Sequence, residues 1–111
     1  MKCISNAFSL SMVKTPALIY IRDADNEEVK DNLPELQSFI GHESTAQIIS
    51  DLLEEPVRAN RAPISLNEGD SCYIFQLLQR LPEGKILTKE EIEQLPYKWL
   101  KVSVLYSERY K

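Results

Sequence analysis

The chain has 111 residues, 43% of them hydrophobic, which suits one folded domain with a single core. Acidic residues number 17 and basic residues 13, so the formal net charge is −4. This charge argues against a protein that binds long nucleic acid nonspecifically, because such proteins usually carry a basic face. It does not exclude a small anionic ligand held by a few arginines.

Neither a membrane segment nor a metal cluster is expected from the composition. The N-terminal residues contain no apolar stretch long enough for a signal peptide or a membrane span. The single histidine cannot supply a histidine cluster, and the two cysteines have no zinc-site spacing. We expect Cys3 and Cys72 to be buried free thiols in a reducing compartment, the protein to be cytosolic, and no cofactor to be required.

The first half of the chain contains two predicted strands and one clear helix. Residues 2–5 and 17–21 are typical of strands. Residues 23–32 are acidic and polar, which favours a loop or a short solvated helix. Apolar residues at helical spacing predict a helix over 44–53, with Ser44 and Gln47 as its capping box.

The second half contains three predicted strands and a shorter helix. A brief strand at 64–66 and a turn at 67–70 precede the longest strand, 71–80. Its almost continuous apolar character indicates a central strand that is covered on both faces. A loop at 81–85, a helix that Thr88 and Glu91 cap, and a final strand at 99–106 follow. The pattern predicts a single α/β domain, residues 1–111, with a largely mixed sheet of about five strands and helices packed on it.

His42 lies two residues before the expected cap, at the start of the best helix. A helix N-terminus attracts phosphate, and a histidine beside it can donate a proton to the leaving oxygen of a phosphodiester. Ser44 and Thr45 add hydroxyl donors. The alternative is an exposed loop histidine beside a capping serine, without a function.

Alternation along the strand at 71–80 places Gln76 and Arg80 on one face. A polar pair on a central strand must be hydrogen-bonded or bind something, and arginine suits phosphate through its planar donors. Glu83, in the following loop, can orient Arg80 or the attacking hydroxyl. The alternatives are an arginine that reaches solvent at the strand end, a glutamine bonded to backbone, and an exposed turn.

Polar turns elsewhere contain Asn6, Ser9 and Arg61. Each of these side chains can hydrogen-bond a phosphate or a base edge, or serve only the local turn.

Four segments in order resemble the viral ring nucleases, a family of type III anti-CRISPR proteins with relatives in bacteria and mobile elements. The segments are Asn6–Ser9, Ile40–Thr45, Asn60–Arg61 and Gln76–Thr88, so the resemblance covers most of the chain. It implies a small α/β homodimer, in the host cytoplasm if the protein is viral. Such a dimer binds cyclic tetra-adenylate at its interface and cleaves it without metal.

The resemblance also implies roles for particular residues. His42 matches the catalytic histidine, and Arg80 and Glu83 match the other active-site residues. The implied ligand contacts are Asn6, Arg61 and Gln76, with Ser9, Ser44 and Thr45 as further candidates. The expected reaction is attack of a 2′-hydroxyl on the adjacent phosphorus, which yields linear di-adenylates. The alternative function is a non-catalytic regulatory protein that binds a cyclic nucleotide or nucleic acid.

Overall fold

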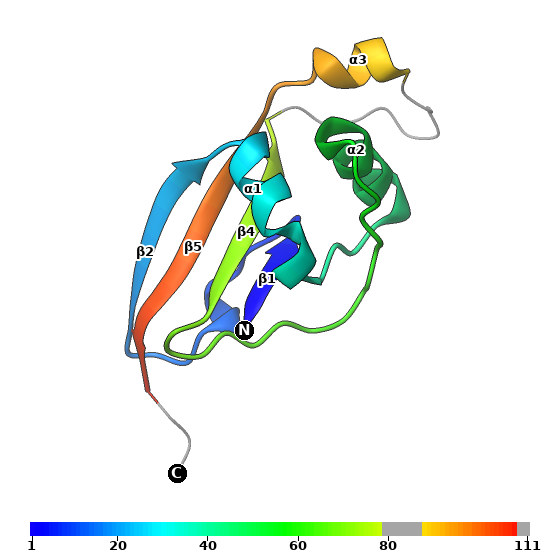
Figure 1. Ribbon diagram of the computed structural model, residues 1–111. Coiled ribbons are helices and arrows are strands. Elements are labelled where there is room, and N and C mark those ends of the chain that lie inside the picture. The colour runs from blue at the N-terminus through cyan, green and yellow to red at the C-terminus, as the bar shows by residue number, and fades with distance from the viewer. Residues whose placement is uncertain (79–87, 109–111) are drawn as a thin grey trace.

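A computed structural model describes residues 1–78 and 88–108 and contains a five-stranded sheet in the order β2-β5-β4-β1-β3 (Figure 1). Strand β1 pairs in parallel with β3 on one side and with the central strand β4 on the other. Strand β5 is antiparallel to both of its neighbours, β4 and β2. The strands are β1 Lys2–Ser5, β2 Ala17–Ala24, β3 Gln37–Ser38, β4 Ser71–Leu77 and β5 Tyr97–Ser107. The predicted α/β class with a mixed five-stranded sheet is therefore confirmed.

The helices are α1 Asn26–Asn32, α2 Glu43–Leu53 and α3 Lys89–Glu93, with short 3-10 turns η1 Leu10–Met12 and η2 Leu33–Glu35. Two of the three α-helices among the described residues begin after a residue whose side chain caps them, Asp25 for α1 and Thr88 for α3. Asp25 caps α1 by accepting a hydrogen bond from the Glu28 N–H at 2.8 Å, so residues 23–32 include a short helix. Thr88 and Glu91 form the predicted capping box of α3. No helix among the described residues is long and apolar enough to cross a membrane.

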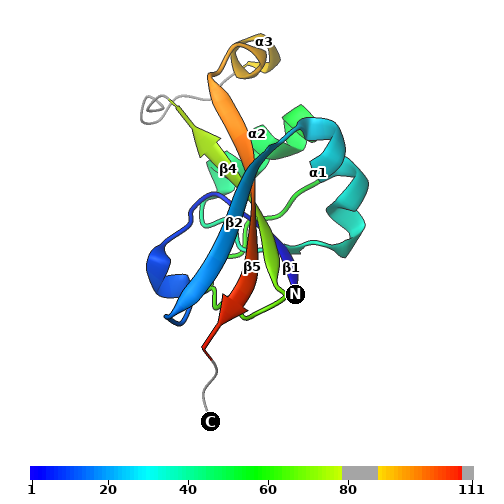
Figure 2. The ribbon, with the colours of Figure 1, turned by 90° about the vertical axis from the view of Figure 1, so that its left-hand side faces the viewer.

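The sheet packs apolar side chains on both faces, and Figure 2 shows α1 on one side and the η1 segment on the other. The face that α1 and α2 cover contains the larger core, which we call the helical core. In it, the ring centroids of Phe75 and Trp99 are 5.0 Å apart. The opposite side contains Cys3 and Cys72, which are paired in the β1–β4 register and are 0% and 1% exposed. The two cysteines are therefore buried free thiols, as predicted.

A polar network joins α1 to the sheet. The Arg22 guanidinium donates to both carboxylate oxygens of Glu28, at 2.9 and 2.6 Å, and the Tyr73 hydroxyl donates to Glu28 Oε2 at 2.6 Å. Hydrogen bonds from Arg22 and then from Tyr73 lower the pKa of Glu28 to about 2. Burial, followed by the hydrogen bond to Glu28, raises the pKa of Tyr73 to about 12. The network fixes α1 against β4.

Two sequence predictions about strands differ from the structure, and one strand was not predicted. The predicted strand at 64–66 is a single bridge in which the Leu66 N–H donates to the Met12 carbonyl at 2.8 Å, because no second residue pairs with a neighbouring strand. The two-residue β3 is too short to show a periodic pattern and was not predicted. The longest described strand is β5, with 11 residues, whereas β4 ends at Leu77 among the described residues. The predicted central position of β4 is confirmed.

Candidate functional site

The candidate site lies at the carboxyl ends of the parallel strands β1 and β4. A cleft of about 220 Å³ is lined by Asn6, Thr45, Phe75, Gln76 and Leu77. Ligands of open α/β sheets bind in such a crevice, outside the carboxyl ends of strands. The structure thus brings three of the predicted ligand-binding residues together.

The first turn of α2 forms one side of this cleft, and it begins one residue earlier than predicted. The N-cap is His42, with extended φ and ψ of −136° and 133°, and its carbonyl accepts the Ala46 N–H at 3.0 Å. The prediction of Ser44 as the cap is wrong, because Ser44 is already a helical residue of the first turn. His42 is exposed and its side chain makes no capping hydrogen bond. The imidazole therefore stands at the helix N-terminus without being used to cap it.

Asn6 connects the end of β1 to the loop that precedes His42. Its Oδ1 accepts the Gly41 N–H at 3.0 Å. None of the described residues accepts a hydrogen bond from Asn6 Nδ2, so this amide group is available to a ligand in the cleft. Asn6 therefore serves the loop and lines the cleft at the same time.

Gln76 lies near the end of β4 and is exposed. Its side chain makes no hydrogen bond with a described residue, so the alternative of a glutamine bonded to backbone finds no support among these residues. The predicted alternation of faces is confirmed, since Tyr73 and Phe75 belong to the helical core and Cys72 and Ile74 to the opposite one.

The remaining predicted residues have different surroundings. Arg61 is exposed and directly follows Asn60, whose N–H donates to the Ile40 carbonyl at 2.8 Å, close to the His42 loop. Ser9 caps η1 by accepting the Ser11 N–H and does not line the cleft, which fits the alternative of a local turn. Arg80 and Glu83 lie outside the described residues.

Phe75 and Leu77 also line the cleft, although they were not among the predicted site residues. Both belong to or pack against the helical core. They reach the cleft because β4 ends there. Their position on either side of Gln76 near a strand end is the signal that predicts this dual role.

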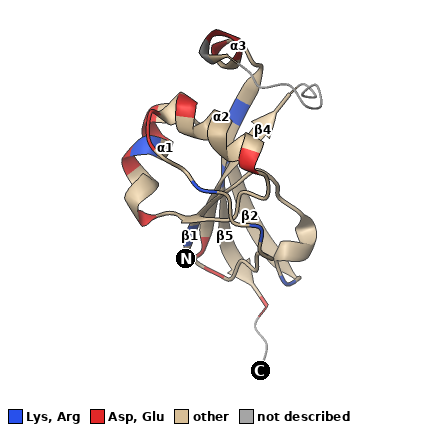
Figure 3. Cartoon of the chain, turned by 90° about the vertical axis from the view of Figure 1, so that its right-hand side faces the viewer, with Lys and Arg blue, Asp and Glu red and all other residues tan. Residues whose placement is uncertain are grey.

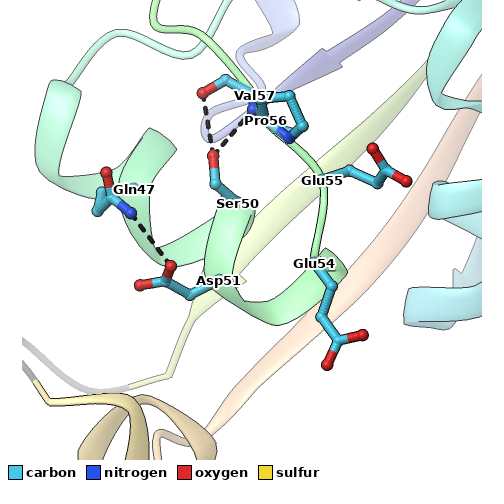
Figure 4. Close-up of a pocket in the computed structure, with 7 residues that line it drawn as sticks. All are labelled: Gln47, Ser50, Asp51, Glu54, Glu55, Pro56 and Val57. Atoms are coloured by element: carbon cyan, nitrogen blue, oxygen red, sulfur yellow. Dashed lines mark hydrogen bonds between the residues drawn. The ribbon is translucent and has the colours of Figure 1, made fainter.

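A larger cleft of about 600 Å³ lies at the other end of α2 and is poorly suited to an anionic ligand. Figure 4 shows its lining residues, Gln47, Ser50, Asp51, Glu54, Glu55, Pro56 and Val57. Three of them are carboxylates and none is basic. Acidic residues also mark α1, α2 and α3 in Figure 3. Like charge repels phosphate, so this acidic cleft is a poor place for an anionic ligand.

Among residues 1–78 and 88–108, no three His, Cys, Asp or Glu side chains gather as a group that could hold a metal ion.

Fold and site together define a small single-sheet α/β protein with a polar cleft beside a helix N-terminus. The chain belongs to the STIV B116-like family, whose model matches residues 2–99. The structure is similar to that of B116 of Sulfolobus turreted icosahedral virus, with a TM-score of 0.81 and 32% identity, over 92% of this chain and 97% of that one.

Sequence relatives come from viruses and from a bacterium. Uncharacterized protein 26 of Sulfolobus islandicus filamentous virus is 35% identical over 98 residues, which cover 85% of this chain and 83% of the relative. Uncharacterized protein YddF of Bacillus subtilis is 35% identical over 63 residues, 57% of this chain and 58% of the relative. These comparisons show a family with viral members, and the names state no activity.

Proposed function

We propose that this protein is a ring nuclease that binds cyclic tetra-adenylate and cleaves it to linear di-adenylates, which counters type III CRISPR signalling. The observation that carries the proposal is the cleft that joins Asn6, Thr45 and Gln76 beside the His42 end of α2. These residues come from three places far apart in the sequence, namely the bend after β1, helix α2 and strand β4. Their convergence fits the resemblance to the ring nucleases.

The helix N-terminus and the two amides are the ligand-binding part of the proposed site. The first turn of α2 presents backbone N–H groups and the positive end of the helix dipole, which attract a phosphate. Asn6 and Gln76 supply amide groups that can donate to phosphate oxygens or pair with adenine edges. The Thr45 hydroxyl adds a donor on the helix side of the cleft.

His42 is the proposed general acid. A ribose 2′-oxygen attacks the adjacent phosphorus and loses its proton to solvent, and the bond from phosphorus to the 5′-oxygen breaks. His42 gives its proton to that 5′-oxygen, and the other product end is a 2′,3′-cyclic phosphate. The roles of Arg80 as a phosphate clamp and of Glu83 as an orienting residue come from the resemblance. Positioning and a placed general acid together lower the barrier without covalent chemistry by the protein.

A homodimer fits the size and symmetry of the ligand. The cleft of about 220 Å³ is smaller than the roughly 300–1,000 Å³ pockets that enclose drug-sized ligands. A cyclic tetranucleotide therefore needs a second surface to cover it. A two-fold dimer presents the same site twice, so one histidine per chain supplies two general acids for two cuts.

The test is cleavage of labelled cyclic tetra-adenylate in the presence of EDTA. We expect the wild type to release linear di-adenylates and His42→Ala to be slower by about 10²–10⁴-fold. Asn67→Ala is a suitable control, because this exposed turn side chain makes no hydrogen bond with a described residue. An intact ring with wild-type protein, or equal rates for wild type and His42→Ala, contradicts the proposal.

A thermal melt with the intact ring separates the alternative function from the proposed one. A binding protein without activity leaves the ring uncut, but the ring stabilises its folded state. At a ring concentration of 100 times Kd, the free energy of unfolding rises by about 2.7 kcal/mol. If the ring neither raises the melting temperature nor is cut, both functions are excluded, the nuclease and the non-catalytic binding protein.

A further inference from the structure

The segment that leads into His42 is hydrogen-bonded on both sides. On the β1 side, the Phe39 N–H donates to the Ile4 carbonyl at 2.8 Å and the Gly41 N–H donates to Asn6 Oδ1 at 3.0 Å. The Phe39 carbonyl accepts the Ser5 hydroxyl at 3.3 Å. The backbone is therefore held to the strand whose carboxyl end forms the cleft.

Ser38 and Asn60 hold the same segment from the other side. The Ser38 hydroxyl donates to the Arg58 carbonyl at 2.5 Å and accepts the Ile40 N–H at 3.3 Å. Asn60 donates two hydrogen bonds to this segment: its backbone N–H donates to the Ile40 carbonyl at 2.8 Å, and its Nδ2 donates to the Ser38 carbonyl at 3.0 Å. We call these four bonds the Ser38–Asn60 bracket; three of them join residues 38–40 to residues 58–60, and the fourth lies within residues 38–40.

The bracket connects two parts of the candidate site. Residue 41 and then His42 follow the first bracketed segment, and Arg61 follows the second. Ile40, at the centre of the bracket, is fully buried at 0% exposure. The bracketed backbone therefore leads directly into the N-cap of α2 on one side and into Arg61 on the other.

We propose that Ser38 is a positioning residue that, together with Asn60, sets the placement of His42 for ring cleavage. The proposal rests on the proposed function. Ser38 touches no reacting group; its hydroxyl acts through the backbone of residues 39–41. A misplacement of about 1 Å in an active site can cost on the order of 10²-fold in rate, so a few tenths of an ångström suffice for a measurable loss.

The test compares Ser38→Ala, Ser38→Thr and Asn60→Ala with wild type in single-turnover and steady-state cleavage. We expect Ser38→Ala and Asn60→Ala each to lower kcat by about 10-fold and to change KM by less than about 3-fold. Ser38→Thr keeps the hydroxyl and should restore most of the rate. Because both residues belong to one network, the double variant should lose much less than the product of the two single losses.

Ser65→Ala is the matched control, because Ser65 is exposed and its hydroxyl makes no hydrogen bond with a described residue. It should retain the wild-type rate. A kcat within 2-fold of wild type (about 0.4 kcal/mol) for both Ser38→Ala and Asn60→Ala overturns the proposal. A kcat of Ser38→Thr that is as low as that of Ser38→Ala also overturns it. If Ser38→Ala does not fold, Asn60→Ala and Ser38→Thr decide between these outcomes.

NMR spectra of the free protein test the bracket without any activity. In Ser38→Ala we expect faster amide exchange at Ile40 and a shifted imidazole resonance of His42, neither of which should occur in Ser65→Ala. If wild type does not cleave the ring, the proposed function fails, while these two signals still show whether Ser38 positions His42. Unchanged signals in Ser38→Ala overturn the positioning role even where the wild type is active.

Discussion

Replacing Glu28 by glutamine should destabilise the protein in a way that depends on pH. The Glu28 carboxylate receives two hydrogen bonds from Arg22 and one from the Tyr73 hydroxyl. These interactions lower its pKa from 4.5 to about 2. Glutamine keeps the side-chain shape but removes the charge, so Glu28→Gln isolates the electrostatic contribution of this carboxylate.

The size of the effect follows from the shift in the pKa of Glu28. At about 1.4 kcal/mol per pH unit, the shift sets an upper limit of about 3 kcal/mol. The side chain is 28% exposed and that of its partner Arg22 is 38% exposed, so solvent screening reduces the contribution to about 1–2 kcal/mol. A lowered pKa means that this stability is present above pH 4.5 and is lost as the pH falls toward 2.

Urea denaturation at several pH values, followed through the fluorescence of the single, buried Trp99, measures this contribution. The difference in unfolding free energy between wild type and Glu28→Gln should be about 1–2 kcal/mol at pH 7 and approach zero near pH 2. Glu27→Gln should show no such trend, because Glu27 lies on the same helix but is exposed, and its side chain makes no hydrogen bond with a described residue. A difference that is equal at pH 7 and pH 3 refutes the reasoning.

Two further substitutions test the ends of α2. Glu54 has a left-handed backbone with φ of 55° at the helix C-terminus, so Glu54→Gly should stabilise the protein by about 1 kcal/mol, and an unchanged or lower melting temperature contradicts this. Glu43 places a negative charge in the first turn, so Glu43→Gln in a His42→Ala background should tighten binding of the uncut ring by about 2–5-fold. Calorimetry that finds weaker binding refutes an anion site at this helix end.

The elements with strong local signals were predictable from the sequence. The strand at 2–5, the end of α2 at Leu53 and the capping box of Thr88 and Glu91 all appear where the pattern placed them. Each depends on residues close together in the chain. The polar face of β4 at Gln76 was predictable for the same reason, because strand alternation needs no knowledge of the neighbouring strand.

The start of α2 was not predictable, because its cap depends on contacts from distant residues. Ser44 has a strong intrinsic preference for the N-cap, whereas His42 does not. The helix nevertheless begins after His42, since the preceding backbone is held by two long-range bonds: Asn6 accepts the Gly41 N–H across 35 residues, and Ser38 donates to the Arg58 carbonyl across 20 residues. Likewise, Ile64–Leu66 lacks a partner strand, and β3 exists only because β1 lies beside it.

The corrected cap changes what the helix end can do. A serine at the N-cap would place its own side-chain oxygen on an N–H of the first turn and compete with a phosphate for that donor. His42 makes no such bond, which leaves the first-turn N–H groups without a capping side chain. The same residue that leaves this end uncapped is the proposed proton donor, so phosphate binding and protonation of the leaving oxygen would occur at adjacent positions of one short segment. A His42→Ser variant tests this coupling, because it should lose both cleavage and affinity for the ring, whereas His42→Ala should lose cleavage alone.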